Sequence, residues 1–327
     1  MNEAMPQLND VFLAAKRIQG LVRNTPLIES PALANPGLRD KVFLKLESLQ
    51  NTGAFKVRGA ANKILGLRPE EKNSGVITFS TGNHGKAVSY VAGCTGTKAI
   101  VCLSERVPPY RIQAIKTLGG QVVVKGKSQD EAEAHYRALL TERGYIPVVP
   151  FDDPSIIAGQ GTIALELLSE QPDLDCILVP LSGGGLLAGI AMAAKSINPG
   201  IRIIGVSIEN SPVMLESLKL GHPVSLPERD TLADSLLGGI GQENHFTLPL
   251  IQKYVDEHVL VTEGEVALGM IYALTHHSLV IEGAAAVGIG ACLGGKILGH
   301  SNRMGIVVTG SAIDPKRYKI LLDQYIS

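Results

Sequence analysis

Short apolar runs separated by helical patterns restrict the fold of this chain more than any other feature. In the first half, strands are predicted at 42–46, 76–79, 99–103, 121–124 and 146–149. In the second half, strands are predicted at 176–181, 201–206, 259–262 and 305–309. The predicted helices cover 8–22, 84–92, 111–118, 156–168, 186–197, 263–276 and 282–293, with two more starting near 54 and 128. Because the strands are apolar without alternation, helices must cover both faces of a parallel sheet, and we predict an α/β fold.

A break in this pattern indicates two domains. The chain has 327 residues, which is long enough for one large or two medium domains. Residues 150–154 begin and end with proline and interrupt the alternation of strands and helices. We therefore predict a large domain of residues 1–68 and 153–327 and a small α/β domain of residues 69–152.

Composition excludes several classes of protein. Apolar residues make up 45% and charged residues 19% of the chain, so it is globular rather than disordered. The net charge of -1 gives no reason to expect nucleic acid or an anionic membrane as a partner. No apolar run reaches the ~18 residues of a membrane span, and the first residues lack the features of a signal peptide. Cys94, Cys102, Cys176 and Cys292 show no C-x-x-C spacing. We expect buried free thiols and a cytoplasmic protein.

Lys56 is the first candidate for chemistry. It follows a break at Asn51-Thr52-Gly53 and falls in the first turn of a predicted helix, between Phe55 and Val57. Loss of solvation between apolar neighbours lowers the pKa of an amine, which makes it a better nucleophile. The alternative is a surface lysine whose stem packs on those neighbours.

Two turns that each link a strand to a helix have the composition of anion sites. Ser182-Gly183-Gly184-Gly185 can direct backbone N–H groups toward a phosphate, and the absence of Gly-Lys-[Ser/Thr] argues against a nucleotide P-loop. Ser80-Thr81-Gly82-Asn83-His84-Gly85 offers hydroxyls, an amide and helix N–H groups to a small carboxylate. The alternatives are a flexible turn for the first, an ordinary helix cap for the second and a structural role for His84.

Thr309 follows the last predicted strand, where ligands of open α/β sheets bind. A nucleophilic lysine, a phosphate site, a carboxylate site and a strand-end hydroxyl are together what pyridoxal phosphate and an amino acid require. We therefore predict pyridoxal 5'-phosphate as the cofactor.

Four stretches of the chain resemble the serine/threonine dehydratases: 46–59, 80–85, 151–162 and 182–189. These are fold-type II pyridoxal-phosphate enzymes, which are tryptophan synthase β-like and also include serine racemase. The resemblance covers about residues 8–315 and implies two open, twisted, mostly parallel sheets with helices on both faces. Within the family, the chain looks most like short dehydratases linked to hydroxyectoine utilisation. Enzymes that act on 3-hydroxyaspartate or phenylserine are near relatives that the pattern does not separate.

The resemblance implies a role for each candidate residue. Lys56 would bond covalently to the cofactor and remove the substrate α-proton, Phe55 would flank the ring, and Asn83 would contact the phenolic oxygen. Thr309 stands where the family has serine or cysteine against the pyridine nitrogen, and Ser-Gly-Gly-Asn of the family is Thr309-Gly310-Ser311-Ala312 here. The implied phosphate ligands are Ser182, Gly183, Gly184, Gly185 and Leu186. The implied substrate-carboxylate ligands are Ser80, Thr81, Gly82, Asn83 and His84.

The resemblance predicts an ammonia-lyase that eliminates water from a β-hydroxy amino acid and gives a 2-oxo acid and ammonia. The substrate would be threonine, serine or 3-hydroxyaspartate. Arg111, Arg58 or Lys116 could bind a second carboxylate, or they are solvated surface charges. One alternative is a serine or aspartate racemase, in which the hydroxyl of Thr81 would act on the second face. Another is a ligand-binding protein that has lost catalysis.

We predict no metal. Racemases of this family hold a divalent cation after the stretch that matches 203–206, but the acidic ligands fall on Ser207 and Val213 here. The nearby carboxylates are Glu209 and Glu216. A homodimer or higher homo-oligomer and closure of the small domain over the substrate are also implied by the resemblance.

Overall fold

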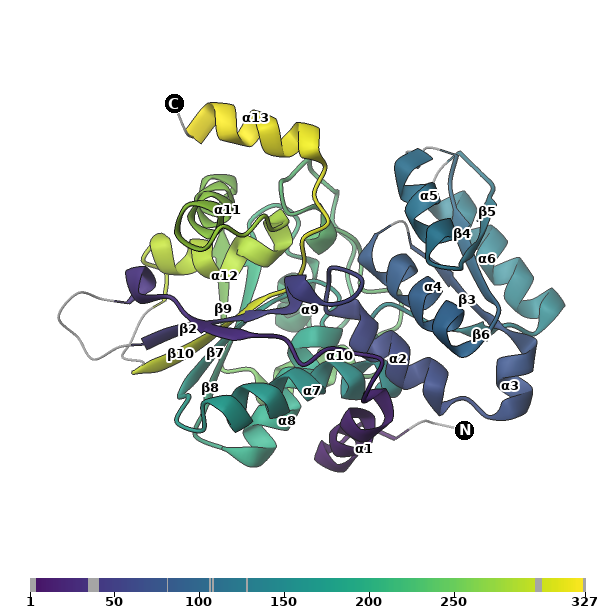
Figure 1. Cartoon of the computed structure of the whole chain (residues 1–327), viewed down its shortest axis with the longest axis horizontal. Helices are drawn as coiled ribbons and strands as arrows, with labels where there is room; N and C mark the ends of the chain where they lie inside the picture. The colour runs from purple at the N-terminus through teal and green to yellow at the C-terminus, as the bar shows by residue number, and fades with distance from the viewer. Residues whose placement is uncertain are drawn as a thin grey trace.

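Two sheets organise the computed structural model, which describes residues 4–34, 41–80, 82–105, 107, 109–127, 129–297 and 302–325 (Figure 1). The larger sheet has six strands in the order β1-β2-β10-β7-β8-β9. They are β1 (Leu27–Glu29), β2 (Lys41–Leu46), β7 (Cys176–Pro180), β8 (Arg202–Ile208), β9 (Glu257–Val261) and β10 (Arg303–Val308). All neighbouring pairs are parallel except β1 and β2. The predicted mostly parallel sheet is confirmed.

The smaller sheet has four parallel strands in the order β5-β4-β3-β6 and lies at the right of Figure 1. They are β3 (Val76–Phe79), β4 (Ala99–Leu103), β5 (Gln121–Val124) and β6 (Ile146–Pro147). All four fall inside the segment 69–152, and the division into domains at 1–68, 69–152 and 153–327 stays a prediction.

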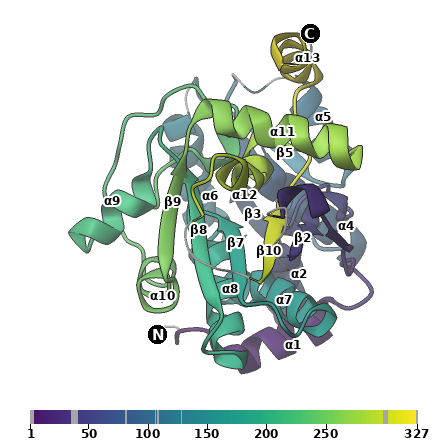
Figure 2. The same ribbon diagram turned by 90° about the vertical axis from the view of Figure 1, so that its left-hand side faces the viewer.

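Helices cover both faces of the larger sheet, as Figure 2 shows. One face packs on α1 (Leu8–Ile18), α7 (Pro154–Glu170), α8 (Gly185–Ile197) and α10 (Thr247–Tyr254). The other packs on α11 (Glu263–His277), α12 (Gly283–Leu293) and α13 (Pro315–Tyr325). Helix α12 consists of small and aliphatic residues and is buried over most of its length, so it fits between the sheet and α11. A Cβ atom at Gly290 of α12 would lie 2.4 Å from the carbonyl oxygen of Glu265, which explains the glycine.

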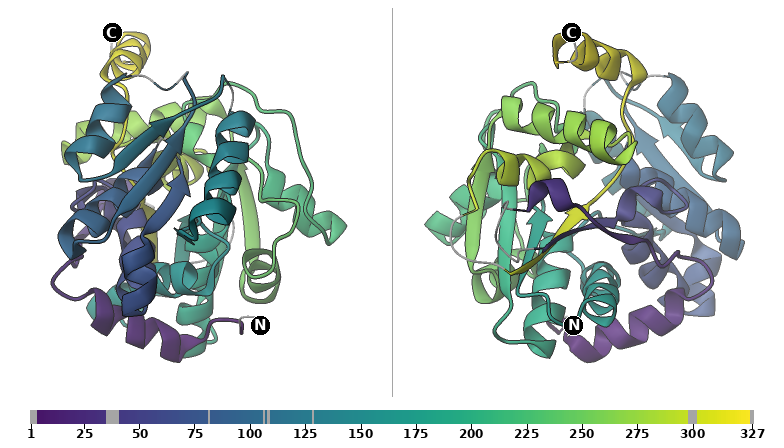
Figure 3. Two further views of the ribbon diagram at one scale, coloured as in Figure 1. Left: turned by 90° about the vertical axis from the view of Figure 1, so that its right-hand side faces the viewer. Right: turned by 60° about the vertical axis from the view of Figure 1, so that its left-hand side comes forward.

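Other helices connect the two sheets or cover the smaller one: α2 (Lys56–Gly66), α3 (Pro69–Ser74), α4 (Asn83–Thr95), α5 (Pro109–Thr117) and α6 (Gln129–Arg143). Helix α9 (Val213–Leu220) instead packs in the core on the larger sheet. Single 3-10 turns lie at Pro31–Leu33, Glu47–Leu49 and Asp234–Leu236. Val57 and Ile64 of α2 share an apolar core with Val88 and Val91 of α4, which joins the two halves. The two views of Figure 3 place α1 and α13 at opposite ends of the molecule.

Most elements are where the sequence predicts them. The first helix ends at Ile18 rather than near 22, and the fourth strand of the smaller sheet stops at Pro147. The sequence pattern does not reveal β1, α3, α9, α10 and α13, which are short or polar. All four cysteines are free, as predicted, but Cys94 is exposed and Cys292 is half-buried. No helix in the described part of the chain is long and apolar enough to cross a membrane.

Buried charges fix the start of α2. Arg58 is only 1% exposed and donates to Glu47 at 2.7 and 2.8 Å and to Glu166 of α7 at 2.6 and 2.8 Å. Burial alone would raise the pKa of the Glu47 carboxyl, but the Arg58 guanidinium holds it below its usual value. The idea that Arg58 binds a substrate carboxylate is therefore wrong, because its donors already serve two glutamates.

We expect Arg58→Met to destabilise the protein by about 3–5 kcal/mol, because Glu47 would remain buried without its partner. Urea unfolding of both proteins measures the difference in the free energy of unfolding. Arg68→Met is the control, since Arg68 pairs with Glu70 and Glu71 on the surface and should change little. Equal effects of the two substitutions would contradict the structural role of Arg58.

Candidate active site

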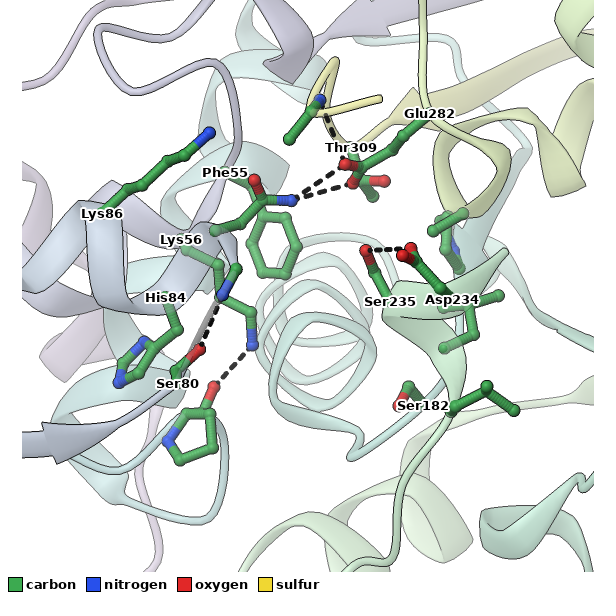
Figure 4. A pocket seen from close by; sticks show the side chains of 18 of the residues that line it. Phe55, Lys56, Ser80, His84, Lys86, Ser182, Asp234, Ser235, Glu282 and Thr309 are labelled. Carbon is green, nitrogen blue, oxygen red and sulfur yellow. Dashed lines mark hydrogen bonds between the residues drawn. The ribbon is translucent and has the colours of Figure 1, made fainter. Parts of the chain in front are cut away.

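A cavity of about 620 Å³ lies between the two sheets. Three strands end at this cavity, and the residues that follow them line it: Ser80 after β3, Ser182 after β7 and Thr309 after β10. This is the edge at which open α/β sheets bind ligands. Figure 4 shows Lys56, Ser80, Ser182, Glu282 and Thr309 around this cavity.

Lys56 is the first residue of α2 and lines the cavity. Its Nζ atom donates to the carbonyl oxygen of Pro150 at 2.7 Å and lies 5.1 Å from the centre of the Phe55 ring. Burial lowers the pKa of Lys56 to about 8, although Glu282 acts in the opposite direction. The interpretation as a surface lysine is wrong, and the interpretation as a nucleophile gains its physical basis.

The loop after β7 requires glycine for steric reasons. A Cβ atom at Gly183 would lie 2.3 Å from Cδ1 of Phe151, and one at Gly184 would lie 2.6 Å from Cδ1 of Ile251. Gly184 also has a φ of +88°, a backbone angle that residues with a side chain rarely adopt. Helix α8 begins at Gly185, so its first N–H groups have no partner within the helix. These amides and the helix dipole form a site for an anion.

Asn83 and Glu282 form a hydrogen-bonded pair in the cavity wall. Asn83 Nδ2 donates to the two carboxylate oxygens of Glu282 at 2.9 and 3.1 Å, and the Ala312 N–H donates to the second at 3.1 Å. Glu282 is 4% exposed, and burial raises its pKa to about 7. Asn83 Oδ1 is buried and has no hydrogen-bond partner among the described residues, so it is available to a ligand.

Glu282 is a residue of the site that the sequence does not predict. It lies 199 positions from Asn83, so no local motif connects the two. The one available signal was a lone carboxylate directly before the helix Gly283–Leu293, which carries no charged side chain. Lys86, Asp234 and Ser235 also line the cavity and were not predicted.

The 80–84 loop is only partly described. Ser80, Gly82 and His84 line the cavity, whereas Thr81 lies outside the described residues. His84 Nε2 contacts the carbonyl oxygen of Val148 at 2.8 Å, and burial lowers the pKa of His84 to about 3. His84 is therefore neutral and has a structural contact, while its contact with a substrate carboxylate stays a prediction.

Some of the remaining predicted residues line the cavity and others do not. Phe55, Leu186 and Thr309 line the cavity, and Thr309 is buried. Arg111 also lines it, whereas Lys116 is exposed and does not. The described residues contain no cluster of three or more His, Cys, Asp or Glu side chains that could hold a metal ion. Of the two carboxylates considered for a metal, Glu209 lies 3.5 Å from the ammonium of Lys296 and Glu216 lies 2.7 Å from that of Lys219.

Comparison with known proteins identifies the family. The family described as "Pyridoxal-phosphate dependent enzyme" matches residues 18–310. The chain belongs to this family. A putative threonine dehydratase of Sinorhizobium fredii is 45% identical over 94% of this chain and 92% of that protein. An L-threonine ammonia-lyase of Thermotoga maritima is 38% identical over 95% of this chain and 76% of that protein.

Solved structures agree with this result. Maize serine racemase aligns with a TM-score of 0.91 at 31% identity and covers 99% of this chain and 98% of its own. The processed form of threonine deaminase isoform 2 from Solanum lycopersicum aligns with a TM-score of 0.89 at 30% identity, over 97% of this chain and 87% of its own. The predicted fold type, cofactor and family are confirmed: the chain is a pyridoxal-phosphate-dependent lyase of the serine/threonine dehydratase family.

The residues of the cavity fit pyridoxal phosphate. The glycine loop provides an anion site in which a Cβ atom at Gly183 or Gly184 would clash with neighbouring side chains. Asn83 offers an oxygen that has no hydrogen-bond partner among the described residues. Burial lowers the pKa of Lys56. These features were predicted from separate parts of the sequence, and the fold brings them to one cavity.

Gly183→Ala should weaken cofactor binding about tenfold or more, because the added methyl group overlaps the Phe151 ring. Titration of the apoprotein with pyridoxal phosphate, followed by absorbance, measures this change. Gly264→Ala is the matched control, since its nearest neighbour is the Thr262 hydroxyl at 3.9 Å. An unchanged dissociation constant for Gly183→Ala would contradict the assigned phosphate site.

Glu282 should make the apoprotein less stable as the pH rises. Its folded-state pKa of about 7 exceeds the ordinary 4.5, so the folded state binds more protons between these values and loses stability as they leave. Between pH 5 and 8, the free energy of unfolding of the wild-type protein should fall by up to about 3 kcal/mol more than that of Glu282→Gln. Urea unfolding at both pH values tests this, with exposed Glu209→Gln as the control. Parallel pH profiles for wild type and Glu282→Gln would show the raised pKa to be wrong.

Proposed function

We propose that this enzyme eliminates water from a β-hydroxy amino acid of the threonine, serine or 3-hydroxyaspartate type. The products would be a 2-oxo acid and ammonia. The main support is Lys56, an amine of lowered pKa in a cavity whose other end is a glycine loop at a helix N-terminus. The similarity to threonine dehydratases and ammonia-lyases supports the same reaction.

We assign each part of the cofactor to residues of this cavity. The phosphate is assigned to the loop from Ser182 to Leu186, the phenolic oxygen to Asn83, and the aldehyde carbon to Lys56. Phe55 is assigned to the ring face and Thr309 to the ring nitrogen. When bound, the cofactor delocalises the charge that develops on the substrate α-carbon. Thr309 provides a neutral hydroxyl at the end of β10, so it does not require a protonated ring nitrogen.

Lys56 is also the proposed general base. A base works best when its pKa lies near the working pH, and a value of about 8 meets this condition. The carbonyl of Pro150, at 2.7 Å, orients the amine within the cavity. The N–H groups at the start of α4 would hold the substrate α-carboxylate beside this amine, which fixes the position of the α-proton.

A racemase on the same scaffold is the second candidate, supported by the similarity to maize serine racemase. It requires a proton donor on the face opposite Lys56. Thr81 was predicted for this role and lies outside the described residues. Elimination is the preferred proposal because the threonine dehydratase and L-threonine ammonia-lyase relatives share 45% and 38% identity with this chain, whereas maize serine racemase shares 31%.

We also propose that the protein works in the cytoplasm as a homodimer or higher homo-oligomer. Its free cysteines are consistent with a reducing compartment. The oligomeric state rests on the family resemblance.

Lys56→Ala should abolish release of 2-oxo acid from serine, threonine and both 3-hydroxyaspartate diastereomers, because both the covalent anchor and the base are removed. A coupled assay for 2-oxo acid measures the elimination, and chiral chromatography of the remaining substrate measures racemisation. Lys116→Ala, an exposed lysine outside the cavity, should behave as wild type. Wild-type turnover by Lys56→Ala would contradict the proposal, and racemisation without elimination by the wild type would favour the alternative.

A further inference from the structure

Two cations face the cavity from the helices beside the smaller sheet. Lys86 belongs to α4, three residues after Asn83, so the two side chains lie on the same face of the helix. Arg111 belongs to α5. Both line the same cavity as Lys56.

The ammonium group of Lys86 makes no hydrogen bond or ion pair with any residue that the structure describes, and no dashed line reaches it in Figure 4. The carboxylate of Glu282 acts on it only as a charge in its neighbourhood. The side chain is half-buried, and burial lowers the pKa of Lys86. Glu282 opposes this shift and Arg111 adds to it. A cation that is partly desolvated and close to a second cation gains stability when an anion binds.

The carboxylates nearby do not meet this need. Glu282 already accepts hydrogen bonds from Asn83 and Ala312. Asp234 lies 3.5 Å from Arg111 Nη2, which is long for a hydrogen bond, and both side chains are partly exposed, at 42% and 30%. Arg111 Nε also donates to the Tyr110 hydroxyl at 3.3 Å. The guanidinium therefore keeps donors that can face a ligand.

We propose that Lys86 and Arg111 bind a second carboxylate of the substrate, which makes the substrate class a β-hydroxy dicarboxylic amino acid such as 3-hydroxyaspartate. This inference rests on the proposed function, in which the α-carboxylate occupies the start of α4. Of the three cations considered from the sequence for a second carboxylate, only Arg111 fits. Arg58 is buried between two glutamates, and Lys116 is exposed outside the cavity. Lys86, which the sequence did not suggest, lines the cavity together with Arg111.

The test compares kcat/KM of the holoenzyme for threonine, serine and both 3-hydroxyaspartate diastereomers. Lys86→Gln keeps a polar, somewhat shorter side chain and removes the charge. It should lower kcat/KM for 3-hydroxyaspartate roughly 10- to 100-fold, mainly through KM, and should lower that for threonine much less. Arg111→Gln should act in the same direction, and Lys116→Gln is the matched control.

A binding measurement gives a second readout that does not depend on turnover. Succinate carries two carboxylates and propionate carries one, so calorimetry with the wild-type holoenzyme should give tighter binding of succinate. Lys86→Gln should remove this difference.

The outcomes separate the two proposals. Turnover of threonine or serine without turnover of either 3-hydroxyaspartate, or an equal loss for all substrates in Lys86→Gln, would overturn the dicarboxylate site alone. Absence of 2-oxo acid from every substrate would overturn the proposed function. In that case, equal affinity for succinate and propionate would overturn the dicarboxylate site as well.

Discussion

The first turn of α2 is held from two directions, and the cavity depends on it. On one side, the Phe55 N–H donates to the carbonyl oxygen of Thr309 at 3.1 Å, which joins the start of α2 to the end of β10. On the other side, Arg58 connects this turn to Glu47 after β2 and to Glu166 of α7. Lys56 lies between these two anchors. Its amine can lose solvation and keep a fixed position because the backbone on both sides of it is fixed.

The cavity uses two means to attract anions. Helices α8 and α4 begin at its wall, and their first N–H groups suit the cofactor phosphate and the substrate α-carboxylate without any formal charge. In our proposal, Lys86 and Arg111 serve a third anionic group, which a dicarboxylic substrate carries and which serine and threonine lack.

Local patterns carried most of what could be predicted. The glycine loop, the lysine in a first helical turn and the apolar strands are each encoded within about ten residues, so the sequence analysis found them. Glu282 was missed because its contact with Asn83 crosses the fold, and Lys86 was missed because only the fold brings it to the wall of the cavity. Arg58 was misassigned for the same reason, since Glu47 is near in sequence but Glu166 lies 108 positions away.

Helices without a clear apolar period were also missed, as α13 illustrates. Its sequence is polar, and only Tyr318 and Leu321 are buried. A pattern of so few apolar positions does not distinguish a packed helix from a polar surface segment. Such helices form because of tertiary packing, and a short window of the sequence holds no information on that packing.

The most direct test of the central claim is to reduce the holoenzyme with borohydride and map the modified lysine by peptide mass spectrometry. Reduction makes the bond between the cofactor and its lysine permanent, so the mark survives digestion. The mark should appear on Lys56 and nowhere else. A mark on Lys86 or another lysine, or no mark on a protein that has bound the cofactor, would contradict the assignment of Lys56.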